Sequence, residues 1–199
     1  MADRKETKKY IFTVEGETEQ WYLYWLRDQI NACEKATYNV SIVASVQQSP
    51  RSYSKTVNAK STPNITHLCD IESNECEHIN KFKNILSEMA EVKKSKKIQY
   101  SLGYSNFTFE LWIILHKENC NGALVDRTQY LPRINRIFGE DFDSLKEYKE
   151  ERKFKRCLSK LTLADVRDAI QRAQAIMKKN REDEKREIQH CRFKYYPDN

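Results

Sequence analysis

Glycine and proline are scarce in this sequence, with 4 of each among 199 residues. Sandwiches built only of β-strands connect many short strands through turns rich in these residues, so their scarcity argues against that class of fold. Long apolar runs are lacking too: no segment has the roughly 20 consecutive apolar residues of a membrane-spanning helix. The chain does not open on a signal peptide. We therefore expect a soluble protein of the cytoplasm that does not enter a membrane.

Closely spaced cysteine pairs are also lacking, because none of the six cysteines forms a C-x-x-C motif. A small disulfide-stabilised domain or a familiar zinc motif would need such spacing, and a zinc site made of Cys69, Cys76 and His78 matches no known pattern. The sequence predicts reduced thiols at all six positions: Cys33, Cys69, Cys76, Cys120, Cys157 and Cys191.

The net charge is modest, at +6 from 35 basic and 29 acidic residues, but basic residues are concentrated in two places. One is the K-K-S-K-K run at 93–97, and the other is the stretch 178–194 near the end of the chain. Either run fits a solvated surface, and the two together fit contacts with phosphate groups. On the second interpretation Lys94 and Lys96 are candidate nucleic-acid-binding residues.

Strands and helices alternate in the first half of the sequence, and only helices are predicted in the second. Apolar runs predict strands at 8–14, 38–46, 65–72 and 97–102, while helical periodicity predicts helices at 17–33, 75–92 and 107–116. The polar segment 47–64 is predicted to be a loop with at most a short helix. Further helices are predicted at 128–138, 144–158 and 162–187. This order predicts an α/β fold with a mostly parallel four-stranded sheet, comprising a core at 1–120 and a helical C-terminal extension at 121–199 packed on it.

Acidic residues follow two of the predicted strands. Glu15 ends the first strand, and Asp70 and Glu72 end the third. Because the carboxyl ends of parallel strands share one edge of the sheet, these carboxylates are expected to converge. Converging carboxylates repel each other, and a hard divalent cation relieves that repulsion, so the three acids predict an Mg²⁺ or Mn²⁺ site. The alternative is that the acids at 15–19 only favour the dipole of the following helix.

The apolar helix predicted at 107–116 contains two polar residues of interest, Glu110 and His116, and follows Ser105 and Asn106. A buried carboxylate without a partner is costly, so Glu110 either meets a basic residue or faces the acidic site. His116 is either a satisfied structural histidine or a catalytic one. Ser105 and Asn106 either cap the helix or contact a phosphate group or a metal-bound water.

Three motifs in this order resemble those of the RloB/AbiLii family of Toprim-related proteins: V-E-G-E-T-E at 14–19, D-I-E at 70–72, and S-N-F-T-F-E-L-W-I-I-L-H at 105–116. The resemblance spans roughly residues 8–175. It implies a Toprim-like fold in which Glu15 matches the Toprim glutamate and Asp70 and Glu72 match its paired acids. Ser105, Asn106, Glu110 and His116 match the motif that is specific to the RloB-like group.

The resemblance further implies a nuclease that uses Mg²⁺ or Mn²⁺ in bacterial defence against phages, beside an ABC/AAA-type ATPase partner. The alternative is a non-catalytic Toprim-like module that binds nucleic acid, a nucleotide or a partner protein. Two departures are visible: Glu72 replaces the second aspartate of the usual D-x-D, and relatives continue past the position of Asn199 through a proline-containing segment. The sequence does not distinguish DNA from RNA as the substrate, and it does not define the sequence preference, the activating signal or the oligomeric state. A homodimer is one of the oligomeric states considered.

Overall fold

The computed structural model describes residues 5–57, 62–73, 75–120 and 126–186. Cys191, one of the cysteines predicted to be reduced, and the basic stretch beyond 186 lie outside these residues, while Cys33, Cys69, Cys76, Cys120 and Cys157 are free thiols. The elements in the first half are β1 (Thr7–Val14), α1 (Glu17–Ala32), β2 (Asn39–Val46), α2 (Pro50–Thr56), β3 (Asn64–Asp70), α3 (Cys76–Ser95), β4 (Gln99–Ser105) and α4 (Glu110–Leu115). They are followed by a 3₁₀ turn, η1 (Arg127–Gln129), and by α5 (Tyr130–Phe138), α6 (Leu145–Tyr148), α7 (Glu151–Leu158) and α8 (Leu163–Arg186).

The four strands form one parallel sheet in the order β2-β1-β3-β4. In the register of the sheet, Phe12 lies between Ala44 of β2 and Thr66 of β3. The predicted fold class is therefore confirmed. Because all strands run the same way, their carboxyl ends form a single edge, which we call the carboxyl edge.

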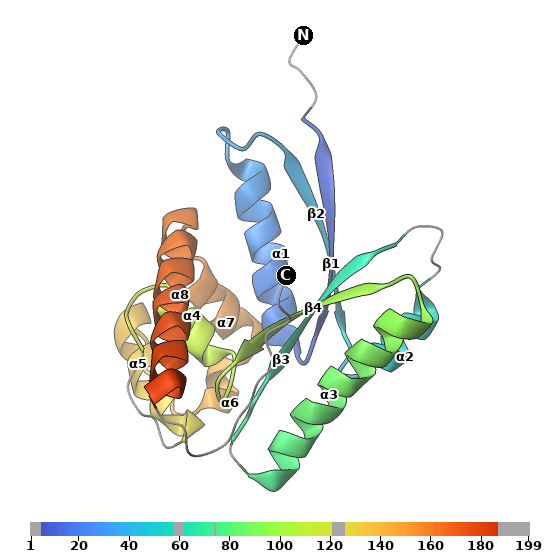
Figure 1. The fold of residues 1–199 in the computed structure, drawn as a ribbon. Coiled ribbons are helices and arrows are strands. Elements are labelled where there is room, and N and C mark those ends of the chain that lie inside the picture. The colour runs from blue at the N-terminus through green and yellow to red at the C-terminus, as the bar shows by residue number, and fades with distance from the viewer. Residues whose placement is uncertain (1–4, 58–61, 74, 121–125, 187–199) are drawn as a thin grey trace.

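Helices cover both faces of the sheet (Figure 1). The main core lies between the sheet, α1, α4 and the C-terminal helices, and it includes Val14, Tyr22, Ile113, Ile134 and Phe154. Helices α2 and α3 lie on the other face, over two smaller apolar clusters. The helices after residue 126 thus share one core with α1 and α4.

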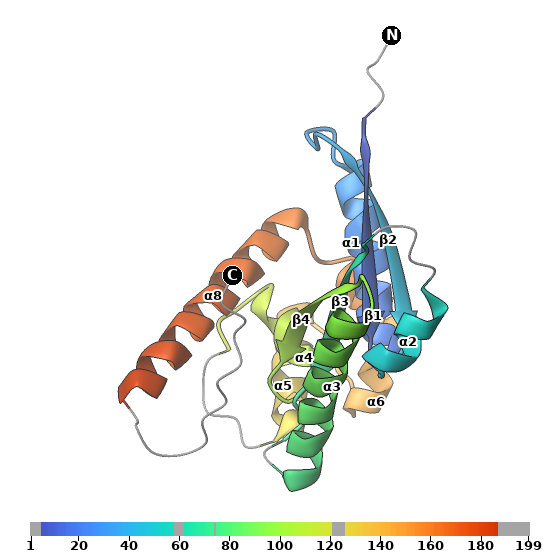
Figure 2. The same ribbon diagram turned by 45° about the vertical axis from the view of Figure 1, so that its right-hand side comes forward.

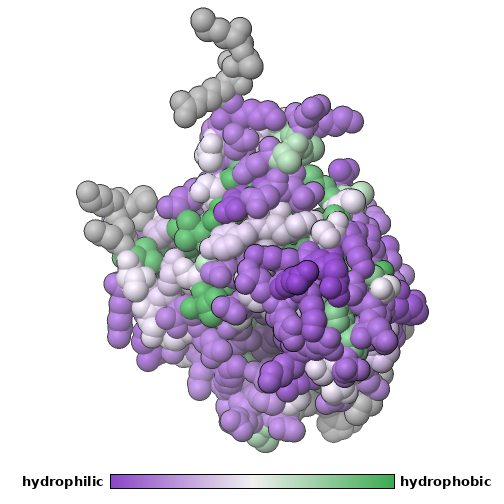
Figure 3. Space-filling view, turned by 180° about the vertical axis from the view of Figure 1, so that it is seen from behind, coloured by the Kyte–Doolittle hydropathy of each residue, from purple (hydrophilic) through white to green (hydrophobic). Residues whose placement is uncertain are grey.

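The largest helices lie at an angle to each other, with α8 reaching away from the sheet (Figure 2). Seen from behind, the surface is mainly hydrophilic, with small separate hydrophobic areas (Figure 3). Among the described residues, no helix combines the length and the apolar character needed to cross a membrane.

Two strand ends differ from the predicted ones, and both lie at the carboxyl edge. β3 ends at Asp70 instead of residue 72, while β4 continues to Ser105 instead of ending at 102. The last pair in their register is Asp70 with Ser105, and the Ile71 amide donates a hydrogen bond of 3.0 Å to the Ser105 carbonyl. Directly after these ends, Glu72 and Phe107 have positive φ angles of 25° and 58°. Such values are costly for residues with a side chain and are concentrated at functional sites.

His67 lies in the middle of β3 with no exposed surface, as expected for a structural histidine. Its Nδ1 lies 2.7 Å from the Oγ1 of Thr13 on the neighbouring strand. Burial lowers the pKa of His67 from 6.5 to about 4. The imidazole is therefore neutral in the folded protein at neutral pH.

We expect His67→Gln to flatten the acid side of the stability curve. Since the folded-state pKa is about 4 and the unfolded value is 6.5, only the unfolded state gains the proton between these values, and the free energy of unfolding falls as the pH falls. The contribution is at most about 3.5 kcal/mol, at about 1.4 kcal/mol per pKa unit. Urea denaturation at pH 7 and pH 5 measures it. An equal loss of stability in wild type and His67→Gln between these pH values would contradict the assignment.

Candidate functional site

Glu15 links the ends of β1 and β3 at the carboxyl edge. It directly follows Val14, the last residue of β1, and α1 begins two residues later. Its Oε2 accepts a hydrogen bond of 3.0 Å from the backbone N–H of Asp70. Its Oε1 lies 3.3 Å from the Nζ of Lys81 on α3. The side chain is thus fixed across two strands.

Asp70, the last residue of β3, has the most perturbed carboxyl group of the site. Burial raises its pKa to about 9, and the negative charges of Glu19, Glu15 and Glu110 contribute to the increase, while Lys149 opposes it. Its Oδ2 accepts a hydrogen bond of 3.3 Å from the backbone N–H of Phe109. A carboxyl group in this setting resists ionisation unless positive charge arrives.

Glu19 lies close to Asp70, and together with Glu15 and Glu110 the two residues form what we call the acidic cluster; Glu19 was not among the site residues predicted from the sequence. It lies in the first turn of α1 and is 6 % exposed. Burial is the main cause that raises its pKa, while the Thr18 hydroxyl, which donates a 3.0 Å hydrogen bond to its Oε2, opposes the increase. A signal was present in the sequence: Leu23 follows Glu19 by four residues, which places Glu19 on the buried face of the helix.

Glu110 satisfies both alternatives considered for it, because it meets a basic residue and also faces the acids. It is 1 % exposed, and its Oε1 lies 3.0 Å from the Nζ of Lys149, the residue that follows α6. Within the described residues its Oε2 is buried without a hydrogen-bond partner. The C-terminal helices therefore supply a counter-charge to acids that lie at the sheet edge.

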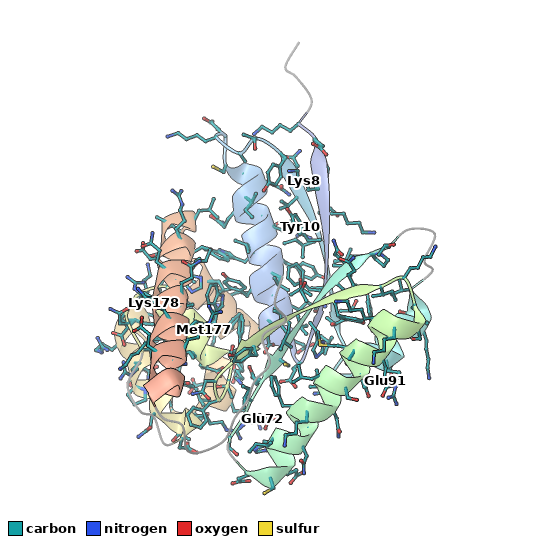
Figure 4. The ribbon with its side chains drawn as sticks, in the orientation of Figure 1. Lys8, Tyr10, Glu72, Glu91, Met177 and Lys178 are labelled. Carbon is teal, nitrogen blue, oxygen red and sulfur yellow. The ribbon has the colours of Figure 1, made fainter. Side chains whose placement is uncertain are left out.

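Glu72 turns towards α3, because β3 ends two residues before it. Its carboxylate is 2.8 Å from the Nζ of Lys81 and 3.3 Å from the Nε2 of His78, both on α3. The hydrogen bond from Lys81 lowers the pKa of Glu72. Figure 4 shows Glu72 beside the start of α3. Lys81 is thus shared between Glu15 and Glu72.

His116 is buried between α1 and α4 with both ring nitrogens in contact with a partner. Nδ1 lies 2.8 Å from the Trp112 carbonyl, and Nε2 lies 3.0 Å from the hydroxyl of Tyr22. Burial lowers its pKa. These contacts fit the structural interpretation, and the catalytic role stays a prediction.

Ser105 and Asn106 do not cap α4, because the residue before that helix is Phe109. Their backbone carbonyls accept hydrogen bonds from the Ile71 amide at 3.0 Å and from the Tyr130 hydroxyl at 3.1 Å. The interpretation as a helix cap is therefore wrong. Both residues lie at the carboxyl edge, where contact with a phosphate group stays a prediction.

Lys94 and Lys96 lie far from the acids. Lys94 and Lys96 are at the C-terminal end of α3, whereas the residue of α3 that contacts Glu15 and Glu72 is Lys81 in its second turn. Lys94 follows Lys81 by 13 residues, which is about 20 Å along a helix. The Nζ of Lys96 donates a 2.6 Å hydrogen bond to the Ser54 carbonyl. The two lysines therefore cannot contact the same phosphate group as Glu15 and Asp70.

The described side chains at this edge have the oxygen atoms that a hard divalent cation prefers, but they are not arranged around one metal position. Carboxylate oxygens are the ligands that Mg²⁺ and Mn²⁺ prefer. Within the described part of the chain, Glu110 Oε2 is buried without a hydrogen-bond partner, while Glu15 Oε1 lies 3.3 Å from the Nζ of Lys81. In that part of the chain, no three His, Cys, Asp or Glu side chains are already arranged around one metal position. The positive charges beside these acids are those of Lys81 and Lys149.

Fold and site together define a parallel α/β protein with acids buried at its carboxyl edge. The chain belongs to the family described as RloB-like protein, and the match covers residues 10–194. This confirms the RloB part of the resemblance, while the relation to Toprim proteins stays a prediction. Comparison with curated proteins and with solved structures finds no significant match.

Proposed function

We propose that this chain is a nuclease of Toprim-like type that depends on Mg²⁺ or Mn²⁺ and cleaves phosphodiester bonds. The observation that supports it most is that Asp70, Glu15, Glu19 and Glu110 gather at the carboxyl edge, where Glu19 and Glu110 are 6 % and 1 % exposed and Glu15 accepts a hydrogen bond from the Asp70 amide. Burial and the charges of the other three acids raise the pKa of Asp70 to about 9. A protein that only needed a stable sheet edge would gain by replacing these acids. Perturbed carboxyl groups at the carboxyl end of parallel strands are typical of a site that receives positive charge.

In this proposal the acids and the two lysines of the site have different roles. A divalent cation held here would supply positive charge close to the phosphate group and would lower the pKa of a nearby water. Asp70, Glu15, Glu19 and Glu110 would hold that cation, with Glu72 joining after release from Lys81. Glu15, already oriented by the Asp70 amide at 3.0 Å, is placed to take the proton of the water. Freed from the carboxylates, Lys81 and Lys149 are placed to contact phosphate oxygens.

The non-catalytic alternative has its own support in Lys81. The ammonium group lies 3.3 Å from Glu15 and 2.8 Å from Glu72, and therefore already compensates two of the predicted metal ligands. A module that only binds nucleic acid, a nucleotide or a partner protein would keep this ion pair. The biological setting that goes with the nuclease proposal is bacterial defence against phages beside an ABC/AAA-type ATPase partner, as implied by the family resemblance.

Cleavage of a substrate panel tests the proposal. Single- and double-stranded DNA and RNA are incubated with Mg²⁺, Mn²⁺ or EDTA, with and without an ATPase partner of the kind that the family resemblance implies. We expect cleavage that requires the metal and that Glu15→Gln abolishes, because glutamine keeps the size of the side chain and removes the charge. A loss on the order of a thousandfold in rate is typical for removing an essential catalytic group.

Glu17→Gln is the matched control, since Glu17 belongs to the same motif but is exposed on the first turn of α1. It should cleave at the wild-type rate. Mn²⁺ binding, followed by electron paramagnetic resonance, separates the two functions: metal bound by wild type and lost in Asp70→Asn supports the site. Cleavage by Glu15→Gln at the wild-type rate would end the nuclease proposal for this site.

A further inference from the structure

A cavity of about 410 Å³ lies directly beside the acidic cluster, between the sheet, α1, α4 and α8. Five aromatic side chains line it: Phe12, Tyr22, Tyr104, Phe109 and Trp112. Glu19 and Asp70 are among its lining residues. The volume is within the range of about 300–1,000 Å³ that is common for small-ligand sites. An aromatic cavity with acids in its wall suits a flat ring that carries hydrogen-bond donors.

The cavity continues into a groove along α8. The groove, of about 700 Å³, shares Trp112, Ile170 and Ala173 with the cavity and is also lined by Lys178 and Arg181. Ile170 and Tyr104, at 44 % and 40 % exposure, are among the most exposed large apolar side chains of the described residues. Figure 4 shows Met177 and Lys178 on α8, which Figure 2 shows reaching away from the sheet. The aromatic cavity therefore opens towards basic side chains.

We infer that this cavity and groove bind a single nucleic-acid strand, with one unpaired base inside the cavity and the backbone along α8. Bases stack on aromatic side chains without regard to sequence, and basic side chains follow the phosphates. A base can enter a pocket of this kind only when it is unpaired or turned out of a duplex. The inference rests on the proposed function and names its substrate class: a strand with an accessible base, whose adjacent phosphate lies at the carboxyl edge.

The acids in the wall predict a preference among bases. An ionised Glu19 carboxylate in the wall would accept hydrogen bonds from exocyclic amino groups, which adenine, cytosine and guanine have and which thymine and uracil lack. We therefore expect a base that carries an amino group to bind better than thymine or uracil.

Equilibrium binding in EDTA tests the inference without any cleavage. A short labelled DNA strand, the same strand as RNA, its duplex and a strand with abasic residues are compared by fluorescence anisotropy. We expect both single strands to bind, whereas the duplex and the abasic strand bind on the order of tenfold or more weakly, which is the size of one lost stacking contact. The comparison of DNA with RNA identifies which strand is preferred.

Two alanines of α8 provide a matched pair of variants. Ala173 lines both the cavity and the groove, whereas Ala175, two residues later, is exposed. Ala173→Phe fills the cavity and should reduce single-strand binding to the level of the abasic strand. Ala175→Phe adds the same ring to the same helix and should bind as wild type. Circular dichroism verifies that both variants are folded.

Two lysines provide the second pair. Lys178 lines the groove, and its exposed neighbour Lys179 is outside the lining set. Lys178→Gln should weaken binding and reduce the slope of log affinity against log salt by about 0.7, the value for one phosphate contact on a single strand. Lys179→Gln should leave that slope close to the wild-type value.

Equal affinity for the abasic strand and the intact strand would overturn the inference, as would unchanged binding by Ala173→Phe. If Ala173→Phe leaves binding unchanged but dissociates an oligomer, the groove is an interface between copies of this chain and the inference fails. Base-dependent binding in a protein that never cleaves supports the inference and contradicts the nuclease proposal. Metal-dependent cleavage with no preference for unpaired bases supports the nuclease proposal and contradicts the inference.

Discussion

Replacing Asp70 with asparagine is expected to abolish metal-dependent cleavage and, at the same time, to make the metal-free protein more stable. Asparagine keeps an oxygen that can accept the 3.3 Å hydrogen bond from the Phe109 amide. It removes a carboxyl group that burial and the charges of Glu19, Glu15 and Glu110 disfavour in its ionised form. Function and stability should therefore change in opposite directions at this one position.

The raised pKa of Asp70 determines how the free energy of unfolding changes with pH. The folded-state pKa of Asp70 is about 9 and its ordinary value is 3.8, so between these values the folded state keeps a proton that the unfolded state has lost. The stabilising contribution of this proton is complete below pH 3.8 and disappears as the pH rises towards 9. At pH 7 the gain from Asp70→Asn has an upper limit of about 4 kcal/mol, at about 1.4 kcal/mol per pKa unit.

Denaturation in urea at several pH values, with and without Mn²⁺, measures this effect. Without metal, Asp70→Asn should be the more stable protein, and its advantage should grow from pH 5 to pH 8. With Mn²⁺ at about a hundred times its dissociation constant, wild type alone should gain about 2.7 kcal/mol. Asp28→Asn, an exposed aspartate on α1, is the control. A destabilised Asp70→Asn protein in EDTA would show that the carboxylate has a structural role.

The sheet and its acidic edge were predictable because they follow from local sequence patterns. Apolar runs of strand length, separated by helical periodicity, identify the four strands, and parallel strands necessarily place Glu15 and Asp70 at one edge. A hydrogen bond of 3.0 Å from the backbone N–H of Asp70 to the Glu15 carboxylate joins the two strand ends.

The rest of the site depends on where the chain turns and on contacts between distant segments. Glu72 was expected beside Asp70 because the third strand was predicted to extend to residue 72, but β3 ends at Asp70 and the positive φ of Glu72 directs its carboxylate to Lys81. Lys149 lies 39 positions after Glu110, and only the packing of the C-terminal helices brings the two together. Neither turn angle nor long-range pairing has a local signal in a single sequence.

The contact between Glu110 and Lys149 predicts that Lys149→Met destabilises the protein. Glu110 is 1 % exposed and its Oε1 lies 3.0 Å from Lys149 Nζ, so Lys149→Met leaves a buried carboxylate without its counter-charge. Breaking a fully buried pair costs about 3–5 kcal/mol, and because the Lys149 side chain is 39 % exposed we expect a smaller loss of about 2 kcal/mol. Lys146→Met, at an exposed position on α6, should change stability by less than about 0.5 kcal/mol.

A double-mutant cycle isolates this pair from other effects of the methionine. In a Glu110→Gln background no charge remains to be compensated, so Lys149→Met should then cost little. In the otherwise wild-type protein, Lys149→Met should increase the affinity for Mn²⁺, because it removes a cation that competes with the metal for Glu110. Urea denaturation of the four proteins and metal titration of wild type and Lys149→Met provide the two measurements. A coupling energy near zero would mean that Lys149 does not compensate Glu110. An unchanged Mn²⁺ affinity would mean that the metal, if it binds, does not use Glu110, and that the acids divide into a metal-binding group and a structural ion pair.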